Sequence, residues 1–161
     1  MQCIDWTNKA GGPKERLAEE QEGKPMNGKR AVRLSSPATL AKPNGYSHVA
    51  EVTGGKMVYV AAQVALDGEG KSVAEGDFQG QVGQVFANLN EALKAAGGSF
   101  ADVIKLTCYC VDRVDRNQLP ALREVRDRYV NTQAPPVSTL VFVSGLVRPE
   151  WLVEIEAVAL W

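Results

Sequence analysis

Apolar residues in the second half of the chain recur at the helical spacing in two segments. From Asp77 to Ala96 they return every three or four positions, as on one face of an α-helix. The first residue of this run is the expected N-cap, and the Gly-Gly pair after it is the expected stop. A second helix is expected to begin near Asn117–Leu119, because Pro120 is tolerated only in a first helical turn.

Runs rich in β-branched and apolar residues, separated by turn residues, predict the strands. Gly54 and Gly55 lie between the second run and the third, an arrangement typical of a β-hairpin. The resulting order, β-β-β-α-β-α-β-β, favours an α+β fold in which a mixed sheet carries both helices on one face. Since the strands are apolar in both registers, we expect the second face to be buried by oligomerisation. The predicted strands are Arg30–Leu34, Tyr46–Thr53, Lys56–Val64, Val103–Val111, Val137–Val143 and Trp151–Trp161.

Composition divides the chain into two parts, and the net charge limits the kinds of partner to be expected. Residues 1–28 read as a polar N-terminal extension with too little apolar content to offset its ordering entropy, and residues 29–161 as one domain. Lys and Arg number 18 against 19 Asp and Glu, so the net charge of −1 lacks the positive excess of a nucleic-acid-binding protein. No apolar run is long enough to span a membrane, and the N-terminus has no signal-peptide core. We therefore expect a cytoplasmic protein without membrane or nucleic-acid partners.

Few side chains outside the last strand carry a chemical signal. The three cysteines have neither the number nor the spacing of a disulfide framework or zinc site, so Cys108 and Cys110 are interpreted as reduced, space-filling residues, and no metal is expected. His48, the one histidine, is more typical of a structural residue than of a catalyst. The arginine row Arg123, Arg126 and Arg128 is expected on the solvated surface. No phosphate-binding loop, dinucleotide fingerprint or nucleophile elbow occurs, so no nucleotide cofactor is indicated.

The last strand carries two carboxylates in an apolar setting. Strand alternation places Glu154 and Glu156 on one face, together with Leu152 and Val158. Buried carboxylates are costly unless they are paired, and two close together raise one pKa, a common device for a general acid or base. The alternative interpretation is a structural ion pair with Arg or Lys of a neighbouring strand.

Three segments together resemble the Rid (reactive intermediate deaminase, YjgF-like) family. GYSHVAEVTGGKMVYVAAQVALDGEG resembles the family pattern PYSxAV…G…VYxSGQxxxD. FQGQVGQVFANLNEALKAAGGSFADVIKLTCYCVD resembles Q…NLxxxLxxAGxxxxDVVKxTVFxxD, and PPVSTLVFV…LVEIEAVA resembles PARSxVxV…LVEIEAIA. The ordered set spans about Arg30 to Leu160, nearly the whole chain apart from the extension.

The resemblance implies a chorismate-mutase-like fold assembled as a homotrimer. In that assembly the sheets form a central barrel, and small-molecule ligands bind in clefts between subunits. It also implies hydrolysis of enamines or imines to a ketone and ammonia, with no cofactor.

Transferred residue by residue, the match is incomplete. Glu154 stands at the position of the family's catalytic glutamate, and Tyr46 at that of its cleft tyrosine. Gln63 matches the glutamine of SGQ, but Ala61 and Ala62 replace the serine and glycine before it. Ser138 stands at the serine of PARS and is expected, with Tyr46, to hydrogen-bond the substrate. Val137 and Trp151 are expected to shape an apolar pocket. Val137 replaces the arginine that holds a substrate carboxylate, and Arg148, on the loop before the last strand, is the alternative cation.

Three hypotheses for function follow from this incomplete match. The first is a hydrolase of an imine, enamine or related reactive molecule without the usual carboxylate contact, with Glu154 as general base or acid. The second is a non-catalytic trimer that binds a small molecule or regulates. The third is an endoribonuclease, an activity ascribed to some family members, which one histidine and the absence of excess positive charge make the weakest.

Overall fold

The computed structural model describes residues 29–161, which form one α+β unit. The polar extension predicted for residues 1–28 lies outside the described residues. Both predicted helices and all the predicted strands occur, with strand ends that differ by a few residues from the expected ones. In chain order the elements are β1 (Ala31–Ser35), β2 (Val49–Thr53), β3 (Met57–Gln63), α1 (Phe78–Ala95), β4 (Val103–Val111), α2 (Leu119–Asp127), β5 (Val137–Val143) and β6 (Val153–Leu160).

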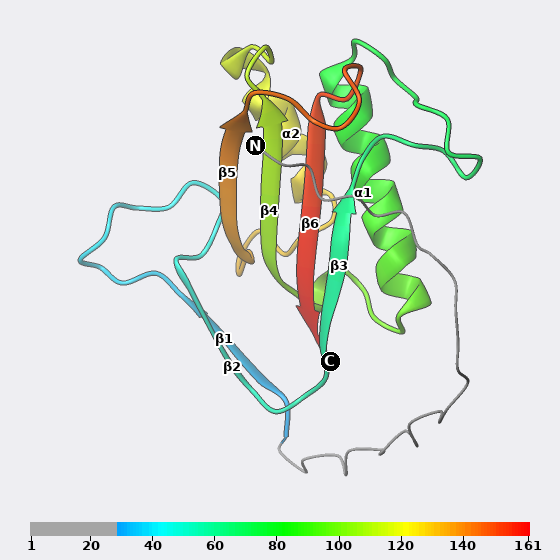
Figure 1. Cartoon of the computed structure of the whole chain (residues 1–161). Coiled ribbons are helices and arrows are strands. Elements are labelled where there is room, and N and C mark those ends of the chain that lie inside the picture. The colour runs from blue at the N-terminus through cyan, green and yellow to red at the C-terminus, as the bar shows by residue number, and fades with distance from the viewer. Residues whose placement is uncertain (1–28) are drawn as a thin grey trace, which may run out of the picture.

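Four of the strands form the main sheet, in the order β3-β6-β4-β5. Strands β4 and β5 run parallel, whereas β6 is antiparallel to both of its neighbours, so the sheet is mixed as predicted. Helices α1 and α2 pack on the same side of it (Figure 1). The opposite side, called here the open face, carries the side chains that alternate with the core residues.

The hairpin predicted at Gly54 and Gly55 is wrong. Strand β2 pairs with β1 in a separate two-stranded sheet, and β3 leaves the turn to pair with β6 (Figure 1). Both glycines adopt positive φ, and the backbones of Lys56 and Trp161 exchange two hydrogen bonds directly after the turn. A Cβ at Gly55 would lie 3.2 Å from Leu160 Cγ, so this close approach favours glycine. The turn therefore redirects the chain to the C-terminal strand instead of folding it back.

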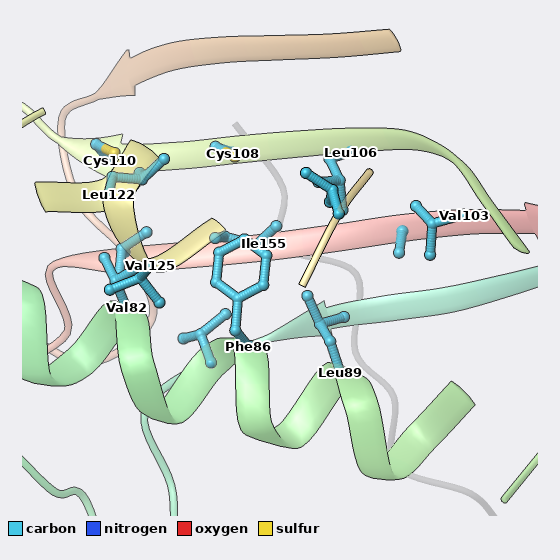
Figure 2. Packing of buried hydrophobic residues seen from close by; sticks show 14 of the residues in the cluster. Val82, Phe86, Leu89, Val103, Leu106, Cys108, Cys110, Leu122, Val125 and Ile155 are labelled. Atoms are coloured by element: carbon cyan, nitrogen blue, oxygen red, sulfur yellow. The ribbon is translucent and has the colours of Figure 1, made fainter. Parts of the chain in front are cut away.

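The core lies between the main sheet and the two helices. Val82, Phe86 and Leu89 of α1 point toward the sheet, where they meet Ile155 of β6 and Leu106 of β4 (Figure 2). Phe86 is fully buried and stacks on Phe100 and Tyr129, with ring centroids 5.7 and 5.3 Å away. The helical spacing of the apolar residues thus becomes the inner surface of the fold.

The open face exposes apolar side chains. Met57, Tyr59 and Val141 are 41%, 75% and 39% exposed, and all three lie on this side of the main sheet. Among residues 29–161, no helix has the length and hydropathy needed to cross a bilayer.

Asp77 caps α1, as the sequence predicted, and its side chain accepts a hydrogen bond from the Gly80 amide. We expect Asp77→Ala to lower the free energy of unfolding by about 1 kcal/mol, because an orphan amide of the first turn loses its partner. Urea unfolding followed by circular dichroism measures this change. Asp77→Asn, which keeps a side-chain oxygen, should cost clearly less, and equal losses in the two variants would contradict the capping role.

Candidate active site and its surroundings

The two glutamates of β6 lie on the open face, as the alternation predicted. Val153, Ile155 and Ala157 of the same strand point into the core and are almost fully buried. Glu154 and Glu156 alternate with them and are half-buried. The strand thus presents two carboxylates on one face, together with Val158 of the same strand.

Strand β4 supplies the neighbours of these carboxylates. Tyr109 pairs with Glu154 across the strands, and its hydroxyl donates a long hydrogen bond of 3.4 Å to Glu156 Oε1. Thr107 pairs with Glu156, and its buried hydroxyl has no hydrogen-bond partner among the described residues. Neither glutamate forms an ion pair with any residue of 29–161, so the structural ion pair that the sequence left open is not formed within this part of the chain.

The environment of Glu154 changes its acidity. Burial first, and the Glu156 carboxylate second, raise the pKa of Glu154 above its usual value. A carboxylate with a raised pKa is a stronger base than a solvated one. Glu154 is therefore the candidate for a general base at this site.

Val137 lies on the same face as Glu154 but far along the sheet. It begins β5 and pairs with Lys105 of β4, whereas Glu154 pairs with Tyr109, four residues further along that strand. Lys105, which the sequence analysis did not single out, is exposed and is the cation paired directly with Val137. Gln63, at the end of β3, pairs with Ile155 and so lies on the strand beside Glu154.

Arg148 and Trp151 form a third group, at the end of the sheet opposite Val137. The guanidinium of Arg148 lies 5.1 Å from the centre of the Trp151 ring, and the indole N–H donates to Ser72 Oγ at 3.1 Å. The ring itself is buried. Val137 begins β5, whereas Arg148 follows the other end of that strand. Within one chain, the Arg148 side chain therefore cannot take the place of an arginine at position 137.

Tyr46 and Ser138 lie away from Glu154, on the helix side of the sheet. Ser138 pairs with the buried Leu106, and both Tyr46 and Ser138 line a cavity beside α2. Arg126 also lines this cavity, and its side chain is only 8% exposed. The expectation that Arg126 lies on the solvated surface is therefore wrong: the apolar stripe of this short helix turns it inward beside Val125 and Leu122.

The remaining candidates are the two thiols of β4 and His48. Burial raises the pKa of the Cys108 thiol to about 12 and that of Cys110 to about 11, so both stay protonated at neutral pH. His48 packs edge-on against Tyr46, with ring centroids 5.2 Å apart, and its buried Nδ1 has no hydrogen-bond partner in residues 29–161. Within the same residues no cluster of His, Cys, Asp and Glu could hold a metal ion.

A family comparison covers most of this fold. The family model described as Endoribonuclease L-PSP matches residues 37–161, which include every strand of the main sheet and both helices. The chain belongs to this family, the Rid or YjgF-like proteins. Its resemblance at the three sequence segments is thereby confirmed.

Relatives in the Rid family include proteins from bacteria, archaea and mammals. Protein DfrA of Myxococcus xanthus is 36% identical over 114 residues, covering 71% of this chain and 83% of its own length. The RutC family protein PH0854 of Pyrococcus horikoshii is 35% identical, covering 73% and 89%. A mouse protein named 2-iminobutanoate/2-iminopropanoate deaminase is 32% identical, covering 78% and 88%.

The fold agrees with a solved Rid structure. A protein of the conserved Rid family from Yersinia pestis superposes with a TM-score of 0.72 at 33% identity, covering 81% of this chain and 98% of that one. The α+β arrangement of a mixed sheet with two helices is thus shared with a Rid protein.

Sequence reasoning singled out Glu154 but not its neighbours on β4. Tyr109 and Thr107 meet the glutamates only through the β4–β6 register, which no local pattern predicts. The burial of Arg126 was not predicted, because charged residues are almost never fully buried unless they are paired. The one available signal was its place three and four residues from Arg123 and Leu122, on the face that packs inward.

Proposed function

We propose that this protein is a Rid-family hydrolase that converts an imine or enamine to a carbonyl compound and ammonia. Glu154 is the general base that activates water, and Gln63, on the adjoining strand, orients the substrate. The reaction needs no cofactor. Water adds its oxygen to the imine carbon, and both of its protons pass in turn to the nitrogen by way of Glu154. The C–N bond then breaks as the C=O bond forms, and nitrogen leaves as ammonia.

One observation carries this proposal: Glu154 is a half-buried carboxylate that forms no ion pair with any residue of 29–161. A desolvated carboxylate without a counter-ion is costly for folding, and general-base work is a reason to keep one. The raised pKa of Glu154 and the hydroxyl of Tyr109 beside Glu156 support the same role. A mouse relative whose name is that of an imine deaminase supports the reaction class.

The substrate proposed here lacks the carboxylate contact usual in the family. Val137 offers an apolar surface in place of a guanidinium, so this subgroup without the arginine is expected to act on imines or enamines with an apolar group at that point. Within one chain Lys105 is the cation beside Val137, so Trp151, with Arg148 stacked on its ring, would complete this pocket from a neighbouring subunit.

The proposal includes assembly as a homotrimer whose sheets form a central barrel. The exposed apolar residues of the open face, such as Tyr59 and Val141, support burial by other subunits. Ligand clefts between subunits would unite Glu154 of one chain with Tyr46 or Ser138 of another, which a single chain holds apart on two sides of its sheet. A cytoplasmic location suits the free thiols of Cys108 and Cys110.

An ammonia-release assay with Val137→Arg tests the assignment of substrate. An amino acid oxidase generates α-imino acids in situ, and carboxylate-free imines from amines serve as the second panel. We expect wild type to act on the carboxylate-free panel. Val137→Arg should gain about tenfold or more on α-imino acids, because a charge-assisted hydrogen bond contributes on the order of 1.5–3 kcal/mol.

Val137→Gln is the matched control, since it is long and polar but carries no charge. An equal gain with glutamine would mean that polarity, not carboxylate recognition, limits the wild type. Ammonia release no faster than the spontaneous hydrolysis of the same imines, with both panels and all three proteins, would contradict the hydrolase proposal.

A second function is favoured by the same substitution. This function is a trimer that binds a small molecule, or has a regulatory role, without turnover. It fits the replacement of the family's arginine by Val137 and of its Ser and Gly by Ala61 and Ala62. Retained ligand binding by Glu154→Gln, with no turnover by wild type, would support that function. An endoribonuclease remains the weakest proposal, because the chain has a net charge of −1.

A further inference from the structure

Tyr109 brings a hydroxyl group to the two glutamates of β6. Its backbone pairs with that of Glu154 across the strands, and its hydroxyl lies 3.4 Å from Oε1 of Glu156, two residues further along β6. An aromatic side chain spans this diagonal between paired strands, so the ring lies beside the Glu154 side chain on its way to Glu156. The phenol oxygen is therefore placed where both carboxylates meet.

The family pattern has its hydroxyl on another strand. In TVFxxD a phenylalanine stands where this chain has Tyr109, and in SGQ a serine stands where this chain has Ala61. Ala61 is exposed and lies two residues beyond Tyr59, on the open face. Relative to the pattern, this chain has therefore lost one hydroxyl and gained one on the same face of the sheet.

The two exchanged positions flank the same carboxylate. The register of β3 against β6 shifts between Val60 and Gln63, and Ala61 falls within this shift, opposite Glu156. Tyr109 reaches Glu156 from β4, on the other side of β6. The hydroxyl missing on β3 and the hydroxyl added on β4 thus belong to one small region of the open face.

The other hydroxyl of this region is not available to a water or a substrate. Thr107 pairs with Glu156, but its hydroxyl is buried and has no hydrogen-bond partner among residues 29–161. Tyr109 is only half-buried, and its bond to Glu156 is longer than the usual O–H···O distance of about 2.7–2.8 Å. Of the two β4 hydroxyls, that of Tyr109 is the one able to meet a reacting molecule.

The surroundings of Tyr109 keep its hydroxyl protonated. Partial desolvation first, and then the negative charges of Glu156 and Glu154, raise the pKa of Tyr109, which is about 10 in an ordinary tyrosine. A neutral phenol donates one hydrogen bond and also accepts through its oxygen. With its proton directed to Glu156, the Tyr109 oxygen can still accept a hydrogen bond from a water beside Glu154.

We propose that Tyr109 is a second catalytic residue of this hydrolase, whose hydroxyl oxygen accepts a hydrogen bond from the attacking water. The inference rests on the proposed function and names the group that orients the water activated by Glu154. A water that donates one hydrogen to Glu154 and the other to Tyr109 turns a lone pair toward the imine carbon, which favours attack. No proton moves to Tyr109, so the proton transfers remain those of Glu154.

Ammonia release by Tyr109→Phe tests this role. Phenylalanine keeps the ring and removes only the oxygen, so we expect kcat to fall about five- to tenfold, the effect of one lost hydrogen bond, with KM within about twofold of wild type. Tyr59→Phe is the matched control, because Tyr59 lies on the same face, is 75% exposed and directs its hydroxyl to Met57 Sδ. It should leave both constants within about twofold.

A double substitution separates contact with water from an effect transmitted through Glu156. If Tyr109 acted only by holding Glu156, Tyr109→Phe would cause no further loss in a Glu156→Gln protein. We expect instead that kcat falls again by about five- to tenfold in that background, because the water contact is still removed.

Restoring a hydroxyl on β3 tests the exchange between the two strands. Ala61→Ser in the Tyr109→Phe protein should recover at least about threefold of the lost kcat, whereas Ala61→Ser alone should stay within about twofold of wild type. Circular dichroism and light scattering on each variant should report an unchanged fold and assembly.

The inference and the hydrolase proposal fail in different ways. Unchanged kcat in Tyr109→Phe, in a protein whose wild type releases ammonia, would overturn this inference alone. So would equal losses in Tyr109→Phe and Tyr59→Phe, a loss that disappears in the Glu156→Gln background, or no recovery with Ala61→Ser. A wild type without turnover of any imine would refute the proposed function, and this inference with it.

Discussion

Replacing Glu154 by glutamine is expected to lower kcat for ammonia release about 10²- to 10⁴-fold, the usual contribution of a general acid or base. Glutamine keeps the size and hydrogen-bonding reach of the side chain but cannot take a proton from water. Turnover of the best imine substrate, measured with and without the substitution, gives the ratio. Light scattering on the same samples should report an unchanged assembly, which would separate lost chemistry from lost folding.

The pH profile of wild type provides a second view of Glu154. A base acts only when ionised, so kcat/KM should rise as pH increases through the pKa of Glu154 and level off above it. Because burial and Glu156 raise that pKa, the rising limb should lie above the usual range of a glutamate. Raising the salt concentration weakens the repulsion from Glu156 and should move the limb slightly downward.

Glu156→Gln is the matched control for both measurements. It removes the neighbouring carboxylate but leaves Glu154, so it should keep most of the turnover and move the rising limb to lower pH. Unchanged turnover in Glu154→Gln would contradict the assignment of the base. A loss in Glu156→Gln as large as that in Glu154→Gln would mean that the carboxylates act as a pair.

Phe86→Ala is expected to lower the free energy of unfolding by about 3–5 kcal/mol. The ring is fully buried, stacks on Phe100 and Tyr129, and faces Ile155 of the main sheet (Figure 2). Its removal loses the burial of a large apolar side chain and leaves a cavity that rigid neighbours fill only in part. Since domains of this kind are stable by only about 5–15 kcal/mol, the loss removes a large share of the total.

Urea unfolding, followed by circular dichroism at fixed protein concentration, measures the effect of Phe86→Ala. Val147→Ala is the control, because Val147 is 88% exposed and its truncation should change stability by no more than about 0.5 kcal/mol. A loss below about 1 kcal/mol for Phe86→Ala would contradict the packing seen around α1.

The buried arginine shows why charge alone is a poor guide to position. Arg123, Arg126 and Arg128 look alike in sequence, yet Arg128 is exposed and paired with Glu124, while Arg126 is buried beside Gly45. A helix of nine residues that packs one face inward turns every third or fourth residue toward the core, and the neighbours there decide what a charge meets. The loop that supplies Gly45 lies about eighty residues earlier, so no local pattern could reveal the contact.

What the sequence by itself determined is local. The spacing of apolar residues predicted α1 and α2, and alternation placed Glu154 and Glu156 on one face of β6, because both periods follow from backbone geometry within a segment. Which strands lie side by side was decided by the tertiary structure. Contacts between distant segments decide that β3 pairs with β6 and not with β2, and that Tyr109 lies beside the glutamates. They also decide that Tyr46 and Ser138 lie away from Glu154. Such contacts form where the free energy of burial across the whole fold outweighs the local conformational preference of a turn. A short segment of sequence shows only the local preference, so it does not predict which strands pair.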